Sequence, residues 1–183
     1  MQDLMMKFHD CLTDADREAC LPAIERLIRL SNICRAYGIL PLEAEAANEE
    51  CIFMKTGLKL IIDGRNPEAV AQILRSLILA GDFHGTALLR RLIIAEGILS
   101  IQNGENTQFL VLRLGAMLGE QYLKCTEELA ARPFDATPED TQAILNLNAE
   151  ALRKSQADML ANLEKELAKG GQIINLHKFD ADN

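Results

Sequence analysis

This chain of 183 residues is poor in aromatic side chains and contains no tryptophan. Aromatic residues make up 4% of the sequence, whereas 49% of it is hydrophobic, so the apolar residues are mainly leucine, isoleucine, alanine and methionine. These residue types favour helices. No stretch alternates apolar and polar residues between hairpin turns, which is the pattern of half-buried strands. The sequence therefore predicts an all-α fold, a compact helical bundle of about six to seven helices.

No apolar run is both long enough and sufficiently free of charge to cross a membrane. A spanning helix needs roughly 20 predominantly apolar residues. The most apolar run, residues 88–101, contains two arginines and Glu96, and the run 74–80 contains Arg75. Residues 1–11 carry Asp3, Lys7, His9 and Asp10 and lack the apolar centre of a signal peptide. We therefore expect no transmembrane segment and a cytoplasmic location.

The sequence also lacks the groupings that are typical of catalytic or metal sites. His9, His84 and His177 are far apart, without the spacing of a metal-binding pair. The five cysteines form neither a CxxC pair nor a disulfide-dense pattern. No nucleophile, base and oxyanion-stabilising group can be assembled from the sequence. We predict that the protein is not an enzyme and has no metal and no cofactor.

Positive charge is scarce. The sequence has 27 acidic residues against 19 lysines and arginines, which gives a net charge of −8 at pH 7. Nucleic-acid binding depends on clustered lysine and arginine. We therefore expect no nucleic-acid partner, and instead a protein partner with a basic or neutral surface.

Capping patterns divide the first part of the chain into helices. Thr13, followed three residues later by an acid, predicts a helix start, and this helix is expected to continue to about Tyr37. Gly38 and Pro41 then predict a kink or a restart, because proline has no amide hydrogen to donate and fits best at the beginning of a helix. An acidic stretch follows before the next apolar run, residues 53–62.

Two Gly-Xaa-Asn sequences predict further helix boundaries. In residues 63–67 (DGRNP) and 103–106 (NGEN), the glycine can end one helix, and an asparagine can cap the next; in the second case Thr107 is an alternative cap. The helix between them, after a turn at residues 81–85, is apolar nearly all round and should lie centrally. Apolar residues at helical spacing over 111–129 then predict one long helix.

The C-terminal part predicts a last helix that starts near Thr137 and ends at Gly170. Its apolar positions repeat at helical spacing: Leu145, Ala149, Leu152, Met159, Leu163 and Leu167. We divide the chain into a helical domain (1–132), a C-terminal helix that packs on this domain or on a partner subunit (133–170), and a tail (171–183). The apolar stripes over 111–129 and 145–167 predict self-association, at least to a dimer.

Three short stretches carry a resemblance. They are residues 35–43 (RAYGILPLE), residues 57–64 (GLKLIIDG) followed by 66–68 (NPE), and residues 96–106 (EGILSIQNGEN). In this order they resemble the cytoplasmic parts of flagellar motor stator A subunits, the MotA/PomA branch of the MotA/TolQ/ExbB proton-channel family. The resemblance covers about residues 24–118. Where that family crosses the membrane twice, this chain has only a short linker, so the resemblance does not extend to proton conduction.

The resemblance also suggests a partner-binding pair. The family's arginine and glutamate that face the rotor match Arg35 and Glu43 by position. Eight residues are just over two helical turns, so both can share a face if Pro41 does not bend the helix much. Pro41 stands where the family usually has alanine, and Thr107 where it has proline, so the helix geometry near both is expected to differ. The alternative is that Arg35 and Glu43 are two solvated charges.

These observations lead to two hypotheses about function. The first is a non-enzymatic cytoplasmic interaction protein, related to stator A subunits, that contacts flagellar motor, cytoskeletal or membrane-complex proteins in motility or chemotaxis. The second is a stand-alone helical regulatory or ligand-binding module whose resemblance to stators is only ancestral. The sequence leaves the identity of the partner open.

Overall fold

The computed structural model describes residues 12–132, 153, 156–157, 159–161 and 164–165. The chain divides into two compact units, Met1–Asp135 and Ala136–Asn183. In the described part of the first unit there are eight α-helices, one 3₁₀ helix and no strand, which confirms the all-α prediction. The elements are α2 (Asp14–Glu18), α3 (Leu21–Tyr37), α4 (Leu42–Ala47), α5 (Ile52–Ile62), α6 (Pro67–Ala80), α7 (Gly85–Gln102), α8 (Thr107–Leu118), η1 (Glu120–Tyr122) and α9 (Leu123–Ala130).

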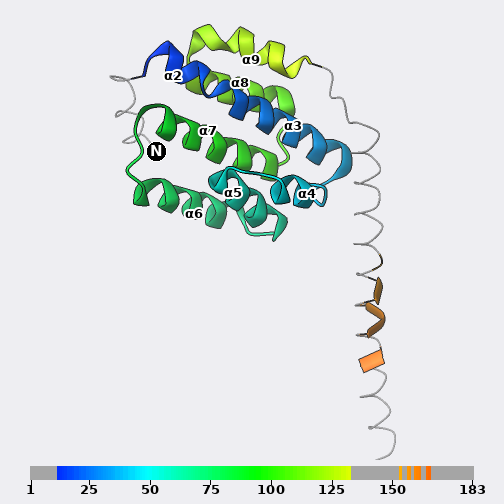
Figure 1. Cartoon of the computed structure of the whole chain (residues 1–183). Helices are drawn as coiled ribbons and strands as arrows, with labels where there is room; N and C mark the ends of the chain where they lie inside the picture. Colours follow the sequence, from blue (N-terminus) through cyan, green and yellow to red (C-terminus); the bar gives the residue numbers. More distant parts are fainter. Residues whose placement is uncertain (1–11, 133–152, 154–155, 158, 162–163, 166–183) are drawn as a thin grey trace, which may run out of the picture. The chain divides into compact units, whose positions relative to one another are not determined.

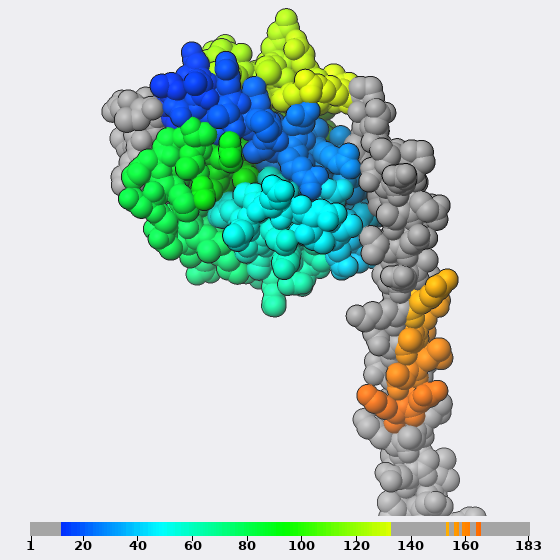
Figure 2. Space-filling view, viewed as in Figure 1, coloured from blue at the N-terminus to red at the C-terminus, as the bar shows by residue number. Residues whose placement is uncertain are grey.

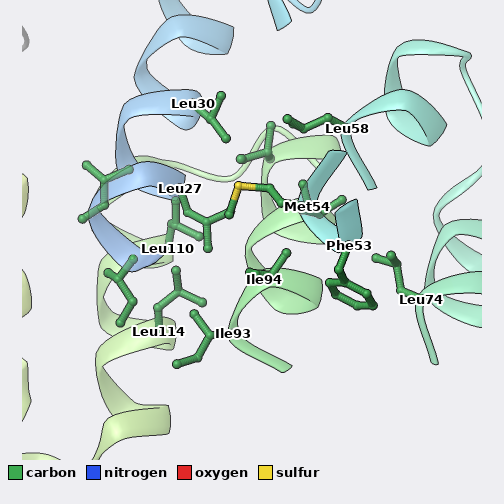
Figure 3. Packing of buried hydrophobic residues seen from close by; sticks show 14 of the residues in the cluster. Leu27, Leu30, Phe53, Met54, Leu58, Leu74, Ile93, Ile94, Leu110 and Leu114 are labelled. Carbon is green, nitrogen blue, oxygen red and sulfur yellow. The ribbon is translucent and has the colours of Figure 1, made fainter. Parts of the chain in front are cut away.

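Helix α7 lies at the centre of the first unit, as its nearly uniform apolar sequence predicts. It packs against α2, α3, α5, α6 and α8 (Figure 1). Its buried residues Ile93 and Ile94 meet Leu27 of α3 and Leu110 and Leu114 of α8 in the core (Figure 3). In the space-filling view of Figure 2, α3, in blue, passes between α9, in yellow-green, and the cyan α4 and α5.

The predicted single helix from Thr13 to Tyr37 is wrong, because the chain forms two helices here. Its start is confirmed: the Thr13 hydroxyl accepts a hydrogen bond from the Asp16 amide at 3.2 Å, and the Asp16 carboxylate accepts one from the Thr13 amide at 2.9 Å. Helix α2 ends at Glu18, and α3 begins at Leu21 with Pro22 in its first turn. A proline ring clashes with the carbonyl four residues earlier in a continuous helix, so the helix restarts.

The predicted long helix over residues 111–129 is also wrong. Gly119, with φ 116°, ends α8, and the chain turns back through η1 so that α9 packs along α8. The close packing is possible because a Cβ on Gly115 would lie 2.5 Å from the Thr126 hydroxyl oxygen. The stripe residues Val111, Leu114, Leu118 and Tyr122 are therefore buried within the first unit, and they give no support to the prediction of self-association.

The connections α5–α6 and α7–α8 are built from the same glycine conformation, backbone hydrogen bond and asparagine cap. Both predicted boundaries are confirmed. Gly64 and Gly104 adopt φ values of 69° and 67°, where glycine is favoured. In both corners the amide after the glycine donates to the carbonyl five residues earlier at 3.1 Å, which closes the preceding helix. Asn66 and Asn106 then cap the next helices, with side-chain oxygens 2.7 and 2.9 Å from the amide nitrogen three residues on.

Several predictions concern residues outside the described part of the chain. These are the helix start near Thr137, the helix end at Gly170 and the tail 171–183, together with His9 and His177. Within the second unit, the described residues Met159 and Leu160 are 61% and 59% exposed.

The carboxylate of Asp16 joins α2 to α7. It accepts a hydrogen bond from the Thr86 hydroxyl as well as those from Thr13. The Thr86 bond, followed by the side-chain and backbone bonds of Thr13, lowers the pKa of Asp16 to about 2 from its ordinary value of 3.8. Because the folded-state pKa lies below the unfolded one, this contribution to stability is complete above pH 4 and is lost as the pH falls towards 2.

We expect Asp16→Asn to lower the urea midpoint of unfolding at pH 7 and to reduce the loss of stability between pH 4 and pH 2. The amide keeps the shape of the side chain but cannot change charge over this interval. Urea titrations followed by circular dichroism at three pH values measure both effects. Asp14→Asn, a change in the same helical turn, serves as the control. An Asp16→Asn variant that loses as much stability as the parent between pH 4 and pH 2 would contradict this account.

Candidate functional site

The three stretches that resemble stator subunits meet at one end of the first unit, where α3, α5 and α7 end (Figure 1). Gln102, at the end of α7, donates through Nε2 to the Arg65 carbonyl oxygen at 2.5 Å. Arg35, in the last turn of α3, donates through Nη1 to the Glu105 carbonyl oxygen at 3.5 Å. Segments separated by 37 and 70 residues are thereby joined, and we call residues 35–43, 57–64 and 96–106 together the motif end.

The close packing within the motif end depends on a glycine from α5. A Cβ on Gly57 would lie 3.0 Å from Cγ1 of Ile98, so α5 and α7 approach closely at this point. Both Gly57 and Ile98 are buried. The second and third stretches are therefore in direct contact, although the first unit of this chain places a complete helix, α6, between them in sequence.

Glu105 organises the polar side chains next to the motif end. One of its carboxylate oxygens accepts a hydrogen bond from the Ser100 hydroxyl at 2.5 Å, and the other lies 3.0 Å from Nη2 of Arg113. The same guanidinium lies 3.6 Å from the Glu96 carboxylate. Ser100 is only 1% exposed, and this bond satisfies its buried hydroxyl. Arg113 is thus held between Glu96 and Glu105, two acids near the opposite ends of segment 96–106.

Thr107 has a structural role that a proline at this position could not supply, because proline has no hydroxyl group. Its hydroxyl donates to the side-chain oxygen of Asn32 at 2.9 Å and lies 3.2 Å from the Ser31 hydroxyl. Ser31 is 2% exposed. The start of α8 is therefore tied to the middle of α3 by side-chain hydrogen bonds.

A small cavity of about 330 Å³ opens at the motif end. It is lined by Ser31, Cys34, Arg35, Ile101, Gly104 and Glu105. Burial raises the pKa of the Cys34 thiol, which keeps it protonated at neutral pH and unsuited to thiolate chemistry. The exposed guanidinium of Arg35 at its rim is suited to binding a carboxylate.

Arg35 and Glu43, the predicted partner-binding pair, lie on two different helices. Gly38, with φ 83°, ends α3, and Pro41 precedes the first residue of α4. The predicted restart at Gly38 and Pro41 is therefore confirmed, and the condition under which the two charges would share one helix face, a helix that Pro41 does not bend much, is not met. Both side chains are exposed, and in the described part of the chain they do not pair with each other. Their role in binding a partner stays a prediction.

The acidic stretch around α4 is partly neutralised by α3, which the sequence did not reveal. Arg26 lies 2.6 Å from the Glu45 carboxylate and 3.2 Å from that of Glu49. Arg29 lies 3.7 Å from Glu45. Of the acids in this stretch, Glu43 and Glu50 remain exposed, and Glu43 is the one nearer in sequence to Arg35.

A larger groove of about 630 Å³ lies between α7 and α8 and was not predicted. Its lining comprises Leu12, Arg17, Leu89, Leu92, Glu96, Arg113, Ala116, Met117, Gly119 and Gln121. The walls are mainly apolar, and the Arg113–Glu96 ion pair is part of the lining. Because Arg113 also binds Glu105, this ion pair connects the groove to the motif end.

The described residues contain no group of three or more histidine, cysteine, aspartate or glutamate side chains that could hold a metal ion. His84 is exposed, with Nε2 2.7 Å from the Asp82 carboxylate. Across these same ranges, no helix has the length and apolar character needed to cross a membrane.

No family model, no curated protein and no solved structure matches this chain. The resemblance to stator subunits therefore rests on the three stretches alone. Besides these stretches, the motif end and the α7–α8 groove are the structural features that bear on function.

Proposed function

We propose that this chain is a non-enzymatic interaction protein of the cytoplasm, related to the cytoplasmic parts of flagellar stator A subunits. It contacts motor or membrane-complex proteins through its helical surface and conducts no ions. The observation that carries the proposal is the motif end: three stretches that resemble the same family in the same order come together at one end of the first unit, held by the Gln102–Arg65 and Arg35–Glu105 contacts.

The charges on this surface favour a protein partner. Within residues 12–132, Arg35 makes one long contact, to a backbone carbonyl at 3.5 Å, and its guanidinium remains exposed. Glu43 is exposed in the first turn of α4, whereas the neighbouring Glu45 is held by Arg26. An exposed cation and an exposed anion thus flank the α3–α4 connection. Opposite charges on a partner surface would orient the partner on this surface and would raise the rate of association.

We expect Arg35→Glu and Glu43→Lys each to weaken partner binding about tenfold, which corresponds to roughly 1.4 kcal/mol. The melting temperature should stay nearly unchanged, because exposed charges contribute little to stability. Added salt should reduce the difference, since exposed pairs are screened over about 8 Å at physiological ionic strength. Affinity capture from the native cell with mass spectrometry identifies the partner, and titration calorimetry with that partner then measures the affinity.

Glu68→Lys, which reverses an exposed acid in the first turn of α6, is the matched control and should leave the affinity unchanged. Charge reversal on the partner should restore binding to the Arg35 and Glu43 variants. If either reversal unfolds the protein, the residue has a structural role, and the assignment fails. If neither changes the affinity for any captured partner, the two residues are solvated charges.

The volume of the α7–α8 groove favours a second candidate, a stand-alone regulatory or ligand-binding module. Small-molecule sites typically occupy about 300–1,000 Å³ and are lined mainly by apolar side chains, and the groove falls in this range. Capture of rotor, stator or chemotaxis proteins would support the motor-related function. Capture of none, together with a metabolite that raises the melting temperature, would support the ligand-binding module.

A further inference from the structure

We infer that the groove between α7 and α8 binds a small monocarboxylate with an unbranched apolar chain of medium length, and that Arg17 holds the carboxylate. The inference rests on the second candidate function, the ligand-binding module, and names its class of ligand; it does not depend on the motor-related function. It is built from side chains of the first unit alone: the charges at the two ends of the groove and the apolar wall between them.

The end of the groove beside α2 is cationic. Arg17 is half-buried in the lining and donates through Nη1 to the Leu118 carbonyl oxygen, and no carboxylate in the described part of the chain forms an ion pair with it. A guanidinium has five N–H donors in a planar fork that matches a carboxylate. Most of these donors therefore remain for a bound anion.

Gly119 leaves space next to this guanidinium. A Cβ at this position would lie 3.5 Å from Nη1 of Arg17 and 2.9 Å from the side-chain oxygen of Gln121. Because glycine has no Cβ, the guanidinium and the Gln121 side chain border a point that no side chain of residue 119 fills. A carboxylate can reach Arg17 from the groove at this point.

The opposite end of the groove does not admit a second anion. Arg113 lies 3.6 Å from the Glu96 carboxylate and 3.0 Å from that of Glu105. Two carboxylates therefore face one guanidinium, and one negative charge is in excess. A second carboxylate on a ligand would be repelled here. The two ends together select a molecule with a single acid group, located at Arg17.

The wall between the two ends is apolar and short. Its side chains range from buried to exposed and are Leu89, Leu92, Ala116 and Met117. Gly119 and Arg113, which mark the two ends on α8, are six residues apart, a rise of about 9 Å. An extended chain of the size of octanoate has this length. A partner helix along this wall would make contact over fewer than about two turns, so a small molecule is the better fit.

The first experiment compares three ligands with the same number of carbons by titration calorimetry on the full chain at pH 7. They are octanoate, octanol and octanedioate. We expect octanoate to bind about tenfold more tightly than octanol, the factor that the loss of one charge-assisted hydrogen bond produces. Octanedioate should also bind about tenfold more weakly than octanoate, because its second carboxylate lies near Glu96.

Substitution of Arg17 tests the carboxylate contact. Arg17→Met keeps an apolar stem and should lower the affinity for octanoate about tenfold, to that of octanol, while the affinity for octanol stays unchanged. Unchanged octanol binding also shows that the groove of the variant is intact. Arg17→Lys keeps the charge without the planar fork and should fall between the parent and Arg17→Met. Arg75→Met, at an exposed arginine of α6, is the matched control and should bind octanoate like the parent.

Substitution of Ala116 tests the location. Ala116 is exposed in the wall, so Ala116→Trp should fill the groove, abolish the binding of octanoate and octanol, and leave the circular dichroism spectrum unchanged. Leu79→Trp, at a residue 63% exposed on α6, is the matched control and should bind both ligands normally.

Three outcomes would overturn the inference. If octanoate and octanol bind equally and Arg17→Met changes neither affinity, the groove does not recognise a carboxylate, although the ligand-binding module stands. If octanoate binds and Ala116→Trp leaves its affinity unchanged, the carboxylate site lies elsewhere. If none of the three ligands binds, the inference and the ligand-binding module fail together, and a dimer in light scattering that Ala116→Trp dissociates would then assign the groove to a second copy.

Discussion

Leu27→Ala should destabilise the first unit by about 3–4 kcal/mol. Leu27 is completely buried in α3 and packs among Met54, Ile94 and Leu110 at the junction of four helices (Figure 3). Removing its branched end takes apolar surface out of the core and leaves a cavity that the neighbouring helices cannot close. Urea unfolding followed by circular dichroism measures the loss.

Leu40→Ala is the matched control for Leu27→Ala, because the same atoms are removed from a side chain that is 40% exposed. We expect it to cost less than about 1 kcal/mol. Equal losses in the two variants would show that Leu27 is not at the centre of the core.

Gly97→Val should destabilise the protein by about 3 kcal/mol through overpacking. A Cβ at Gly97 would lie 2.5 and 2.7 Å from the two terminal carbons of Leu27. Leu27 is completely buried, so its side chain has no free space into which it could move. Urea unfolding followed by circular dichroism measures this loss as well.

Gly57→Ala is the control with a milder steric clash. Its Cβ would lie 3.0 Å from Ile98, and the gain in helix propensity of about 1 kcal/mol offsets this clash. We therefore expect it to be nearly neutral.

The two large effects should not add. In the double variant Leu27→Ala/Gly97→Val, the valine enters the space that the leucine has left, so the total loss should be smaller than the sum by at least about 1 kcal/mol. Additive losses would mean that Gly97 and Leu27 do not contact each other in the folded protein.

The sequence predicted the helix boundaries whose chemistry is local. Thr13, Asn66 and Asn106 each satisfy amide groups within three residues, so the pattern that identifies the cap is contained in a short window. Two breaks were missed for different reasons. Cys20 precedes α3 without a side-chain cap, so only Pro22 marked the restart. Gly119 lies inside the apolar repeat over residues 111–129 that predicts one helix, although its positive φ makes it the residue that ends α8.

The sequence predicted parts of the candidate site, but not their arrangement. Arg35 and Glu43 were identified by resemblance, and their exposure agrees with a surface role, but their separation on two helices follows from the Gly38 conformation. Contact between the corners at residues 65 and 102 depends on how α5 and α7 pack, which no short window contains. The groove was missed because the apolar faces of α7 and α8 look like core, and only tertiary packing leaves part of them uncovered.

The connection between α6 and α7, residues 81–84, lies at the opposite end of α7 from the motif end. Its Asp82 and His84 side chains are 95% and 82% exposed, and among the described residues they bond to each other. Exposed polar turns of this kind tolerate inserted segments. A long insertion here would leave the contacts among α3, α5 and α7 in place. The fold is therefore modular at this turn, and the same helical scaffold is compatible with a chain that runs directly from α6 to α7 and with one that carries an inserted segment between them.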